Sequence, residues 1–265
     1  MKTAIFSDIH SNPAALEKCL AHAESYGCTK FVCLGDIVGY GYDPNACIEI
    51  CRRKGMLCLM GNHEAGLTGR LPLGWFSYSA YAGIVRQKEQ LSPEVLKWMD
   101  NLPFKQSEMS DDGFPIVFSH GTYEFPERFD YIRYSFEALH EFRFLHRDRL
   151  RALFVGHTHF ANYFTHEKEA EWTVNEGYID LEDASPINVA EHGCTIVNVG
   201  SVGYPRNQPY SVYCIYDDAT HTATHRILDF DFDDYRRQME QANIEVPLWI
   251  QFKQKEAESS PIGFR

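Results

Sequence analysis

The chain has too few basic residues to balance its acidic ones. Its 265 residues include 25 lysines and arginines against 37 aspartates and glutamates, which gives a formal net charge of -12. An excess of this sign repels DNA, RNA and anionic membranes, so we expect no stable nucleic-acid partner. A small phosphorylated substrate remains compatible with this charge, because bound divalent cations reverse it locally.

Long apolar runs are also missing. No stretch approaches the roughly 20 apolar residues of a membrane-spanning helix, so we expect no membrane association. Residues 1–8 are typical of a strand that leads into a polar residue and not of a secretory signal. None of the eight cysteines forms a CxxC pair, and most lie in apolar patterns. We therefore expect reduced, mostly buried thiols in a cytoplasmic protein, and not a secreted disulfide framework.

The chain lacks any Gly/Ser-rich linker, Pro-rich hinge or regular repeat that would divide it. Its length is enough for one large domain with a substantial core. We expect a single domain over residues 1–249, followed by a polar C-terminal tail over residues 250–265. The oligomeric state is left open.

A recurring pattern points to a functional site. Five times, four mostly apolar residues run into one small residue and then into a side chain that can bind a metal. The five segments are residues 3–8, 31–36, 57–62, 115–120 and 152–157. A short apolar run bounded by a turn residue predicts a buried strand. If the five strands lie side by side, their carboxyl ends share one edge of a sheet, where open α/β sheets bind ligands.

Helix and strand signals alternate early in the chain and give way to strands later. Helices are predicted over residues 13–27, 44–54, 93–100, 134–145 and 231–241, with helical character throughout 65–101. Further strands are predicted over residues 104–108, 162–165, 171–174, 194–199, 210–216 and 223–228. The acidic stretch 167–183 is expected to be a solvated excursion from a sheet. The role of the helical segment that follows the third strand is left open.

The polar residues at the strand ends are of the types that bind metals. Asp8 and His10 are two positions apart, as are His157 and His159, and on an extended segment such pairs point the same way. Asp36 has two oxygens and can bridge two ions. Mixed nitrogen and oxygen ligands suit Mn²⁺, Fe²⁺/Fe³⁺ or Zn²⁺ better than Ca²⁺ or Mg²⁺. The candidate ligands are Asp8, His10, Asp36, Asn62, His120, His157 and His159.

Each of these motifs has an ordinary interpretation when taken alone. A single Asp-x-His pair is more often a turn or a surface pair, and a single histidine is more often a hydrogen-bonded core residue than a ligand. Five strand ends with the same pattern are improbable by chance, so the set as a whole favours metal binding.

Five motifs occur in a fixed order, and together they resemble the calcineurin-like metallophosphoesterase family, while residues 39–45 resemble its bacterial phosphodiesterase-like members. The five motifs are Asp8-Ile9-His10, Gly35-Asp36, Gly61-Asn62-His63-Glu64, Ser119-His120-Gly121 and Gly156-His157-Thr158-His159. The resemblance implies a four-layer α/β/β/α sandwich of two mixed β-sheets flanked by helices. It also implies two divalent metal ions and hydrolysis of a P–O bond by attack of a metal-bridging hydroxide.

The resemblance further implies how the site residues divide their roles. One ion is expected to be bound by Asp8, His10, Asp36 and His159, and the other by Asp36, Asn62, His120 and His157. Asp36 and Asn62 would then act as catalytic residues through the ions that they hold. His63 lies beside Asn62 but outside this ligand set, and it takes the family's role of general acid or transition-state stabiliser. The alternative for His63 is structural support of Asp36.

Three further features are candidates for substrate binding. Arg206 follows a segment similar to the family's Asn-x-Gly-Ser and would hold a substrate phosphate, unless it forms only a surface ion pair. Tyr40 or Tyr42, in a glycine-rich stretch, would line the cleft, unless the glycines simply shape a turn. Residues 121–129 combine aromatic side chains with Arg128 and would anchor a base or aryl group, unless they form an ordinary packed loop.

We therefore expect a metal-dependent phosphoric ester hydrolase, with a phosphodiesterase of small or nucleotide diesters as the first hypothesis. A diester carries one negative charge and needs a proton-assisted leaving group, which His63 can provide. The alternatives are a phosphomonoesterase or protein phosphatase, a diadenosine polyphosphate hydrolase, a nuclease of short oligonucleotides and a non-catalytic scaffold of the same fold. The presence of His63 and of every ligand argues against the scaffold.

Overall fold

A computed structural model describes most of the chain. It covers residues 1–110, 112–167, 173–179, 185–206, 209–247 and 250. Of the tail expected over residues 250–265, only Ile250 falls within this range, and it is buried in an apolar cluster with Phe230, Tyr235 and Met239. Most of the acidic stretch 167–183 lies outside the described residues. The proposed domain boundary therefore stays a prediction.

The first sheet has six strands within the described residues. They are β1 (Lys2–Phe6), β2 (Lys30–Cys33), β3 (Leu57–Cys58), β9 (Ile187–Asn188), β11 (Tyr210–Asp217) and β12 (Thr222–Asp229). Their order is β3-β2-β1-β11-β12-β9. The first three pair in parallel and the others pair antiparallel.

The second sheet of the described residues also has six strands. They are β4 (Lys105–Met109), β5 (Pro115–Ser119), β6 (Ala152–Val155), β7 (Ala161–His166), β8 (Asn175–Tyr178) and β10 (Cys194–Val199). Their order is β4-β5-β6-β10-β7-β8, with β5, β6 and β10 in parallel. The five strands of the recurring pattern are thus divided, three in the first sheet and two in the second. The hypothesis that all five share one sheet edge is wrong.

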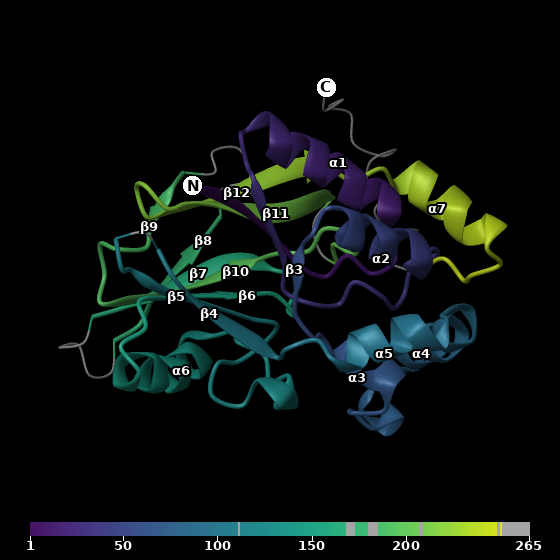
Figure 1. Cartoon of the computed structure of the whole chain (residues 1–265), viewed down its shortest axis with the longest axis horizontal. Coiled ribbons are helices and arrows are strands. Elements are labelled where there is room, and N and C mark those ends of the chain that lie inside the picture. Colours follow the sequence, from purple (N-terminus) through teal and green to yellow (C-terminus); the bar gives the residue numbers. More distant parts are fainter. Residues whose placement is uncertain (111, 168–172, 180–184, 207–208, 248–249, 251–265) are drawn as a thin grey trace.

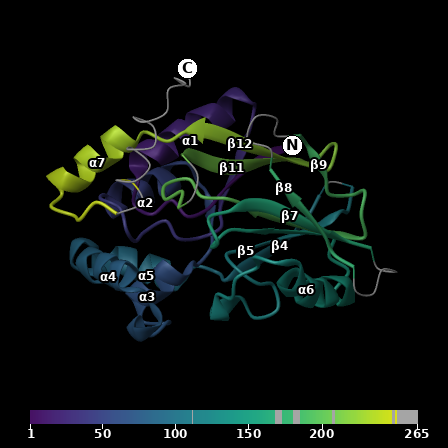
Figure 2. The same cartoon turned by 180° about the vertical axis from the view of Figure 1, so that it is seen from behind.

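Helices flank the two sheets. They are α1 (Pro13–Ser25), α2 (Pro44–Arg53), α3 (Asn62–Thr68), α4 (Tyr78–Gln90), α5 (Pro93–Asp100), α6 (Ser135–Arg147) and α7 (Phe232–Gln241), with 3₁₀ turns η1 (Leu73–Trp75) and η2 (Pro126–Arg128). In Figure 1, α1 and α2 lie over the first sheet and α6 lies under the second. The view from behind in Figure 2 shows the same layers, with α3, α4 and α5 grouped beside them. The expected four-layer α/β/β/α sandwich is confirmed.

The apolar strands are buried on both faces, which explains why their sequences are continuously hydrophobic and do not alternate with polar residues. Successive side chains of a strand point to opposite faces. In β1, Ala4 and Phe6 therefore pack in the cluster under α1 and α2, while Ile5 packs between the two sheets. In β6, Phe154 packs between the sheets and Leu153 packs against α6.

The helix starts that matter for the site follow their sequence signals. The Asn12 side chain accepts a hydrogen bond from the backbone N–H of Ala15 at 3.1 Å, and Pro13 is the first residue of α1. Asp43 caps α2 in the same way, with Ala46 as the donor at 2.9 Å. These caps end the loops that follow β1 and β2, so they fix where the loops can run.

The remaining differences between prediction and structure are local. The strand predicted over residues 171–174 begins later, as β8, and residues 171–172 lie outside the described range. The two-residue strand β9 was not predicted. All eight cysteines are free and buried, as expected. Within the described residues, no helix combines the length and the apolarity that crossing a bilayer requires.

Candidate metal centre

The seven predicted ligands come together between the two sheets. Asp8, His10, Asp36 and Asn62 follow strands of the first sheet, whereas His120, His157 and His159 follow β5 and β6 of the second. All seven side chains are buried. The sheets face each other with their ligand-bearing strand ends at the same end of the sandwich, so residues up to about 150 positions apart meet there.

The ligand loops have an unusual backbone conformation. The φ angles of Asp8, His10, Asp36, His157 and His159 are 53°, 46°, 54°, 65° and 67°. Positive φ is uncommon for residues other than glycine and has to be held by the surrounding structure. The two i, i+2 pairs therefore do reach a common point, but not through an extended strand as predicted. The left-handed turns direct the side chains inward.

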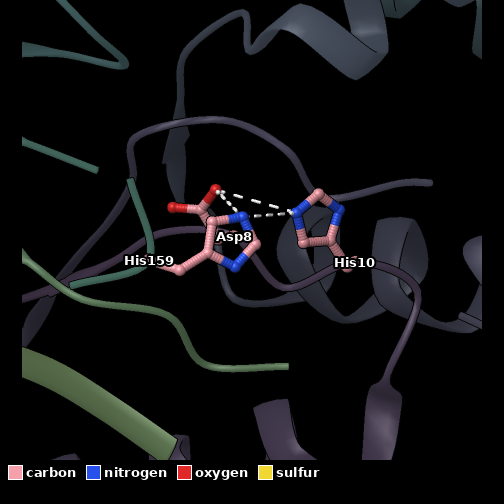
Figure 3. Close-up of side chains that lie close together, drawn as sticks. All are labelled: Asp8, His10 and His159. Atoms are coloured by element: carbon pink, nitrogen blue, oxygen red, sulfur yellow. Dashed lines mark hydrogen bonds and ion pairs between the residues drawn. The ribbon is translucent and has the colours of Figure 1, made fainter. Parts of the chain in front are cut away.

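One ligand group consists of Asp8, His10 and His159 (Figure 3). Asp8 Oδ1 lies 3.2 Å from His159 Nε2 and 3.7 Å from His10 Nε2. The two Nε2 atoms are 3.3 Å apart, and Asp36 Oδ2 is 3.6 Å from His10 Nε2. Ligand atoms at about 2.0–2.2 Å from a shared ion are separated by about 3–3.5 Å. The spacing of the group therefore fits an ion.

The second ligand group surrounds His120. Its Nε2 atom lies 3.2 Å from Asn62 Oδ1, 3.1 Å from His157 Nδ1 and 3.4 Å from Asp36 Oδ2. His157 Nε2 lies 2.9 Å from the Phe129 carbonyl, which can only accept, so in the neutral ring Nδ1 carries a lone pair toward His120. Asp36 Oδ2 is close to both groups, which is the arrangement that a bridging carboxylate requires.

The hydrogen bonds behind the first group provide an independent test of metal fit. His10 Nδ1 lies 2.9 Å from the Val38 carbonyl, and His159 Nδ1 lies 2.5 Å from the Tyr204 carbonyl. A carbonyl only accepts, so both Nδ1 atoms carry hydrogen, and in neutral rings both Nε2 atoms present lone pairs. Two lone pairs that face each other repel, whereas a cation between them is bound by both. Such backbone partners commonly orient metal-binding histidines.

The electrostatics agree with this geometry. Burial opposes the ionisation of Asp8 and Asp36, but the surrounding histidines outweigh it and hold the pKa of both carboxyls below the usual range. Burial lowers the pKa of His157 and His63 to about 3, which keeps both imidazoles neutral. For His120, burial is outweighed by the nearby carboxylates, which raise its pKa to about 9. Carboxylates and neutral imidazoles are the forms that bind metal. Asp8, Asp36 and His157 are therefore already in the required form, whereas His120 has to lose its proton when an ion binds.

Glu64 is a supporting residue to which the sequence analysis gave no role. Its fully buried carboxylate accepts hydrogen bonds from the backbone N–H groups of Asp36 at 2.8 Å, Gly61 at 2.9 Å and Val38 at 3.1 Å. Burial and the charge of Asp36 raise its pKa to about 7. The signal was present in the sequence, because a glutamate three residues after a helix N-cap commonly turns back to the cap.

The segment that resembles Asn-x-Gly-Ser supports the site from the other sheet. Asn198 Nδ2 donates to the carbonyl of Gly156 at 2.8 Å, immediately before His157. Ser201 Oγ donates to the backbone carbonyl of Asp8 at 3.0 Å. These two side chains connect β10 to ligand loops of both sheets and so fix the distance between the two halves of the centre.

A cleft of about 590 Å³ opens over the metal centre. It is lined by Asp36, Tyr40, Asn62, His63, Trp75, Phe76, Ser77, Ser79, Ala80, Tyr131, His157, Tyr204 and Arg206. We call residues 66–104 the cap. Residues 75–80 of the cap, from η1 and the start of α4, form one wall of the site.

His63 lies at the base of this cleft. Its backbone N–H donates to Asp36 Oδ1 at 2.9 Å, and its Nε2 is 4.0 Å from Asp36 Oδ2. A ring nitrogen of His63 also lies within 4.8 Å of ligand atoms of His10 and Asp36. Among the described residues, its buried Nδ1 atom has no hydrogen-bond partner. The Nδ1 atom of His63 therefore lies against Gly39, and the Nε2 atom is the ring nitrogen on the side of Asp36.

Two of the three predicted substrate-binding residues line the cleft. Arg206 lies over the metal centre, and one of its terminal nitrogens is 3.4 Å from the hydroxyl of Tyr40. Tyr40 stacks on Tyr204 with ring centroids 4.3 Å apart. The third residue, Arg128, lies outside the cleft, where it pairs with Asp130 at 3.0 Å and lines a neighbouring cavity.

Tyr42, the alternative to Tyr40, is not among the residues that line the cleft. Its hydroxyl donates to Asn12 Oδ1 at 3.3 Å, and its ring meets the edge of Tyr235 in α7. The glycine-rich stretch therefore contributes Tyr40 to the site and uses Tyr42 for packing.

A four-layer sandwich with two adjoining ligand groups at its strand ends defines the class of metallophosphoesterases. Residues 1–221 match the family model described as the calcineurin-like phosphoesterase superfamily domain. The chain belongs to this superfamily, whose members act on phosphorylated substrates and typically use two metal ions.

Individual relatives agree with the family assignment. The chain is 35% identical over 216 residues to an uncharacterized protein of Methanocaldococcus jannaschii, covering 81% of this chain and 82% of that protein. The crystal structure of a metallophosphoesterase from Sphaerobacter thermophilus is similar with a TM-score of 0.76 at 28% identity, over 94% of this chain and 97% of the other. A hypothetical protein from Pyrococcus horikoshii shares the fold, with a TM-score of 0.71 at 15% identity over 95% and 96% of the two chains.

Proposed function

We propose that the protein is a dinuclear phosphodiesterase that hydrolyses small or nucleotide phosphodiesters. The observation that carries the proposal is the position of Asp36. Its carboxylate contacts both ligand groups at the floor of a cleft that also holds His63 and Arg206. Two ions held in this way, one by each ligand group, would stabilise the charge of the phosphoryl transition state and lower the pKa of water.

The side chains around the centre have separate tasks in this proposal. Arg206 binds a non-bridging oxygen of the phosphate and orients the diester over the ligand groups. His63 donates a ring N–H to the departing oxygen. Because burial keeps its imidazole neutral, this arrangement supports a hydrogen-bonding transition-state stabiliser over a preformed imidazolium. Tyr40 and Tyr204 form a stacked wall that excludes water from one side of the cleft.

The charge of the cleft favours a diester over the alternatives. Among the described residues that line it, Arg206 is the one lysine or arginine. A phosphomonoester or a diadenosine polyphosphate brings more negative charge and needs more cationic partners. A phosphodiester has a single charge and apolar substituents on both sides, which match one arginine between aromatic walls.

The donor set also guides the choice of metal. The described ligand groups consist of histidines and carboxylates, with the Asn62 amide oxygen beside them. This mixture favours Mn²⁺, Fe²⁺/Fe³⁺ or Zn²⁺. A cytoplasmic location forms part of the same proposal and is supported by the eight free, buried thiols.

Turnover of two matched esters tests the proposal. The metal-depleted protein is reconstituted with Mn²⁺, Fe²⁺, Co²⁺, Ni²⁺ or Zn²⁺ and is assayed with bis(p-nitrophenyl) phosphate and with p-nitrophenyl phosphate. We expect the diester to have the higher kcat/KM with at least one metal. Preference for the monoester would place the protein among phosphomonoesterases. Inactivity toward both esters with every metal would reject the proposal that the protein is a phosphoesterase.

A further inference from the structure

A second cavity lies directly beside the metal cleft. Its volume is about 610 Å³, within the range of roughly 300–1,000 Å³ that is typical of small-molecule sites. Trp75 in η1 and Tyr131 line both cavities and form the boundary between them. The Tyr131 ring stacks on the imidazole of His157 with centroids 4.1 Å apart. The two cavities are therefore neighbours, with these two aromatic rings between them.

Aromatic side chains line this second cavity and are unusually exposed. Trp75, Phe125 and Phe136 have 45%, 44% and 70% of their surface accessible. These three rings have partners at longer range, namely His157 at 6.3 Å from Trp75, Arg128 at 5.8 Å from Phe125 and Tyr134 at 5.9 Å from Phe136. Tyr131 is more enclosed, because His157 stacks on its ring at 4.1 Å and the guanidinium of Arg133 lies 5.0 Å from the ring centroid. Accessible aromatic faces inside a concave site are suited to stacking on another flat ring.

The charged residues of the second cavity largely neutralise one another. Arg128 pairs with Asp130 at 3.0 Å, and Arg133 pairs with Glu137 at 3.2 Å. A phosphate or other anion would have to compete with these carboxylates. A neutral group with polar edges does not, because the paired groups and His140 still offer hydrogen-bond donors and acceptors.

We infer that the second cavity is a subsite for a nucleoside attached to the scissile phosphate. The base stacks on Trp75, with Phe125 and Phe136 around it, while the phosphate lies at the metal centre. This inference rests on the proposed phosphodiesterase function and narrows its substrate class to diesters with a nucleoside substituent. It also gives a role to residues 121–129, for which the sequence left a base-binding loop and an ordinary packed loop open.

Two esters with the same leaving group test the subsite. Thymidine 5′-(p-nitrophenyl) phosphate and methyl p-nitrophenyl phosphate both release nitrophenolate, but only the first carries a nucleoside. We expect the wild-type kcat/KM to be about tenfold or more higher for the thymidine ester. Stacking of one base on one aromatic ring is worth about this factor. Trp75→Ala should reduce the ratio of the two kcat/KM values about tenfold, and Phe136→Ala should reduce it less.

Tyr78→Ala is the matched control variant. Tyr78 is an 85% exposed aromatic residue on the same cap, but it is not among the residues of either cavity. We expect this variant to keep the wild-type ratio. A wild-type ratio near one would overturn the inference. A Trp75→Ala variant that loses activity equally toward both esters would also overturn it, because Trp75 would then act only on the metal centre.

Equilibrium dialysis with adenosine separates this inference from the proposed function. The subsite predicts that adenosine binds to the wild-type protein and that Trp75→Ala weakens the binding about tenfold, with or without turnover of any ester. If adenosine binds in this way but neither ester is hydrolysed, the proposed phosphodiesterase activity is rejected and the nucleoside subsite is supported. If both esters are hydrolysed but adenosine does not bind, the proposed phosphodiesterase activity is supported and the nucleoside subsite is rejected.

Discussion

The floor and the walls of the cleft are built in opposite ways. On the floor, buried ligands follow strands of both sheets, and Glu64, Asn198 and Ser201 hold their loops by hydrogen bonds to the backbone. The walls come from residues 75–80 of the cap and from the loop after β5, and they present aromatic rings such as Trp75 and Tyr131. The comparison suggests that the floor fixes the chemistry and the walls select the substrate.

Polar contacts from α4 join the cap to the loops after β1 and β2. Gln87 in α4 is fully buried, accepts a hydrogen bond from the N–H of Gly39 at 2.6 Å and donates to Ser11 Oγ at 2.9 Å. Arg86 donates to the carbonyls of Tyr40 and Gly41 at 2.9 and 2.8 Å. If the two regions have separate roles, changes in the floor should alter metal content and kcat, whereas changes in the walls should alter substrate preference.

The largest expected effect comes from Asp36. Asp36→Ala removes the carboxylate that contacts both ligand groups, so both ions should bind weakly. Loss of several kcal/mol of transition-state stabilisation lowers kcat by about 10³-fold or more. Elemental analysis should show less than one ion per chain. Asp233→Ala, which removes an exposed carboxylate in α7 that pairs with Arg236 at 3.6 Å, serves as the control. An Asp36→Ala protein with two tightly bound ions would contradict the assignment of Asp36 as the bridge.

The next effect concerns His63. His63→Ala should lower kcat for the diester by about 10²–10⁴-fold, because the departing oxygen loses its hydrogen-bond donor. Metal content should stay close to that of the wild type, as measured by elemental analysis. The control is His192→Ala. His192 pairs with Glu167 and does not line the cleft, so this variant should change neither kcat nor metal content. If His63→Ala instead loses metal, His63 belongs to the ligand groups, next to His10 and Asp36.

A smaller effect is expected from Glu64. Glu64→Gln keeps the size of the side chain but replaces an acceptor oxygen by a donor NH₂, so one of three backbone N–H groups loses its partner. Weaker support of a ligand typically lowers metal affinity about 10–100-fold. Titration with a competing chelator measures this change. An unchanged affinity would mean that the loops after β2 and β3 hold their shape without this carboxylate.

The smallest effect on chemistry is expected in the wall. Gln87→Leu leaves the Gly39 N–H and the Ser11 hydroxyl without their partner, which costs about 1–3 kcal/mol of folding stability. Thermal unfolding should show a lower Tm, whereas metal affinity should change little. A large loss of metal in this variant would show that the cap also positions the floor, and the division between the two regions would fail.

The sequence predicted the floor well because its signals are local. Five of the seven candidate ligands directly follow an apolar strand and a small residue, as in Gly35-Asp36 and Gly156-His157, and such strands are recognisable when they are buried on both faces. The pairing of strands is a long-range property, so the sequence did not show that β5 and β6 belong to a different sheet from β1, β2 and β3. It also did not show that Asp8 and His10 adopt positive φ, which depends on neighbours such as Ser201 and Gly203.

The walls were harder to predict for a physical reason. Trp75 and Tyr131 have no periodic or motif context, and their position depends on how the cap and the loop fold back over the centre. Arg128 was expected to help anchor a base or aryl group, and this role stays a prediction: the residue lies in the neighbouring cavity, where Asp130 pairs with it. Glu64 was within reach of sequence reasoning through its capping position, whereas Gln87 was not, since its partners lie in loops about 46–76 residues away.

The central claim is that two ions bind at the strand ends of both sheets. Anomalous diffraction from crystals grown with Mn²⁺ tests it most directly. The account predicts two peaks about 3.5–4 Å apart, one beside Asp8, His10 and His159 and the other beside Asn62, His120 and His157, with Asp36 between them. A single peak, or two peaks away from these side chains, would contradict it.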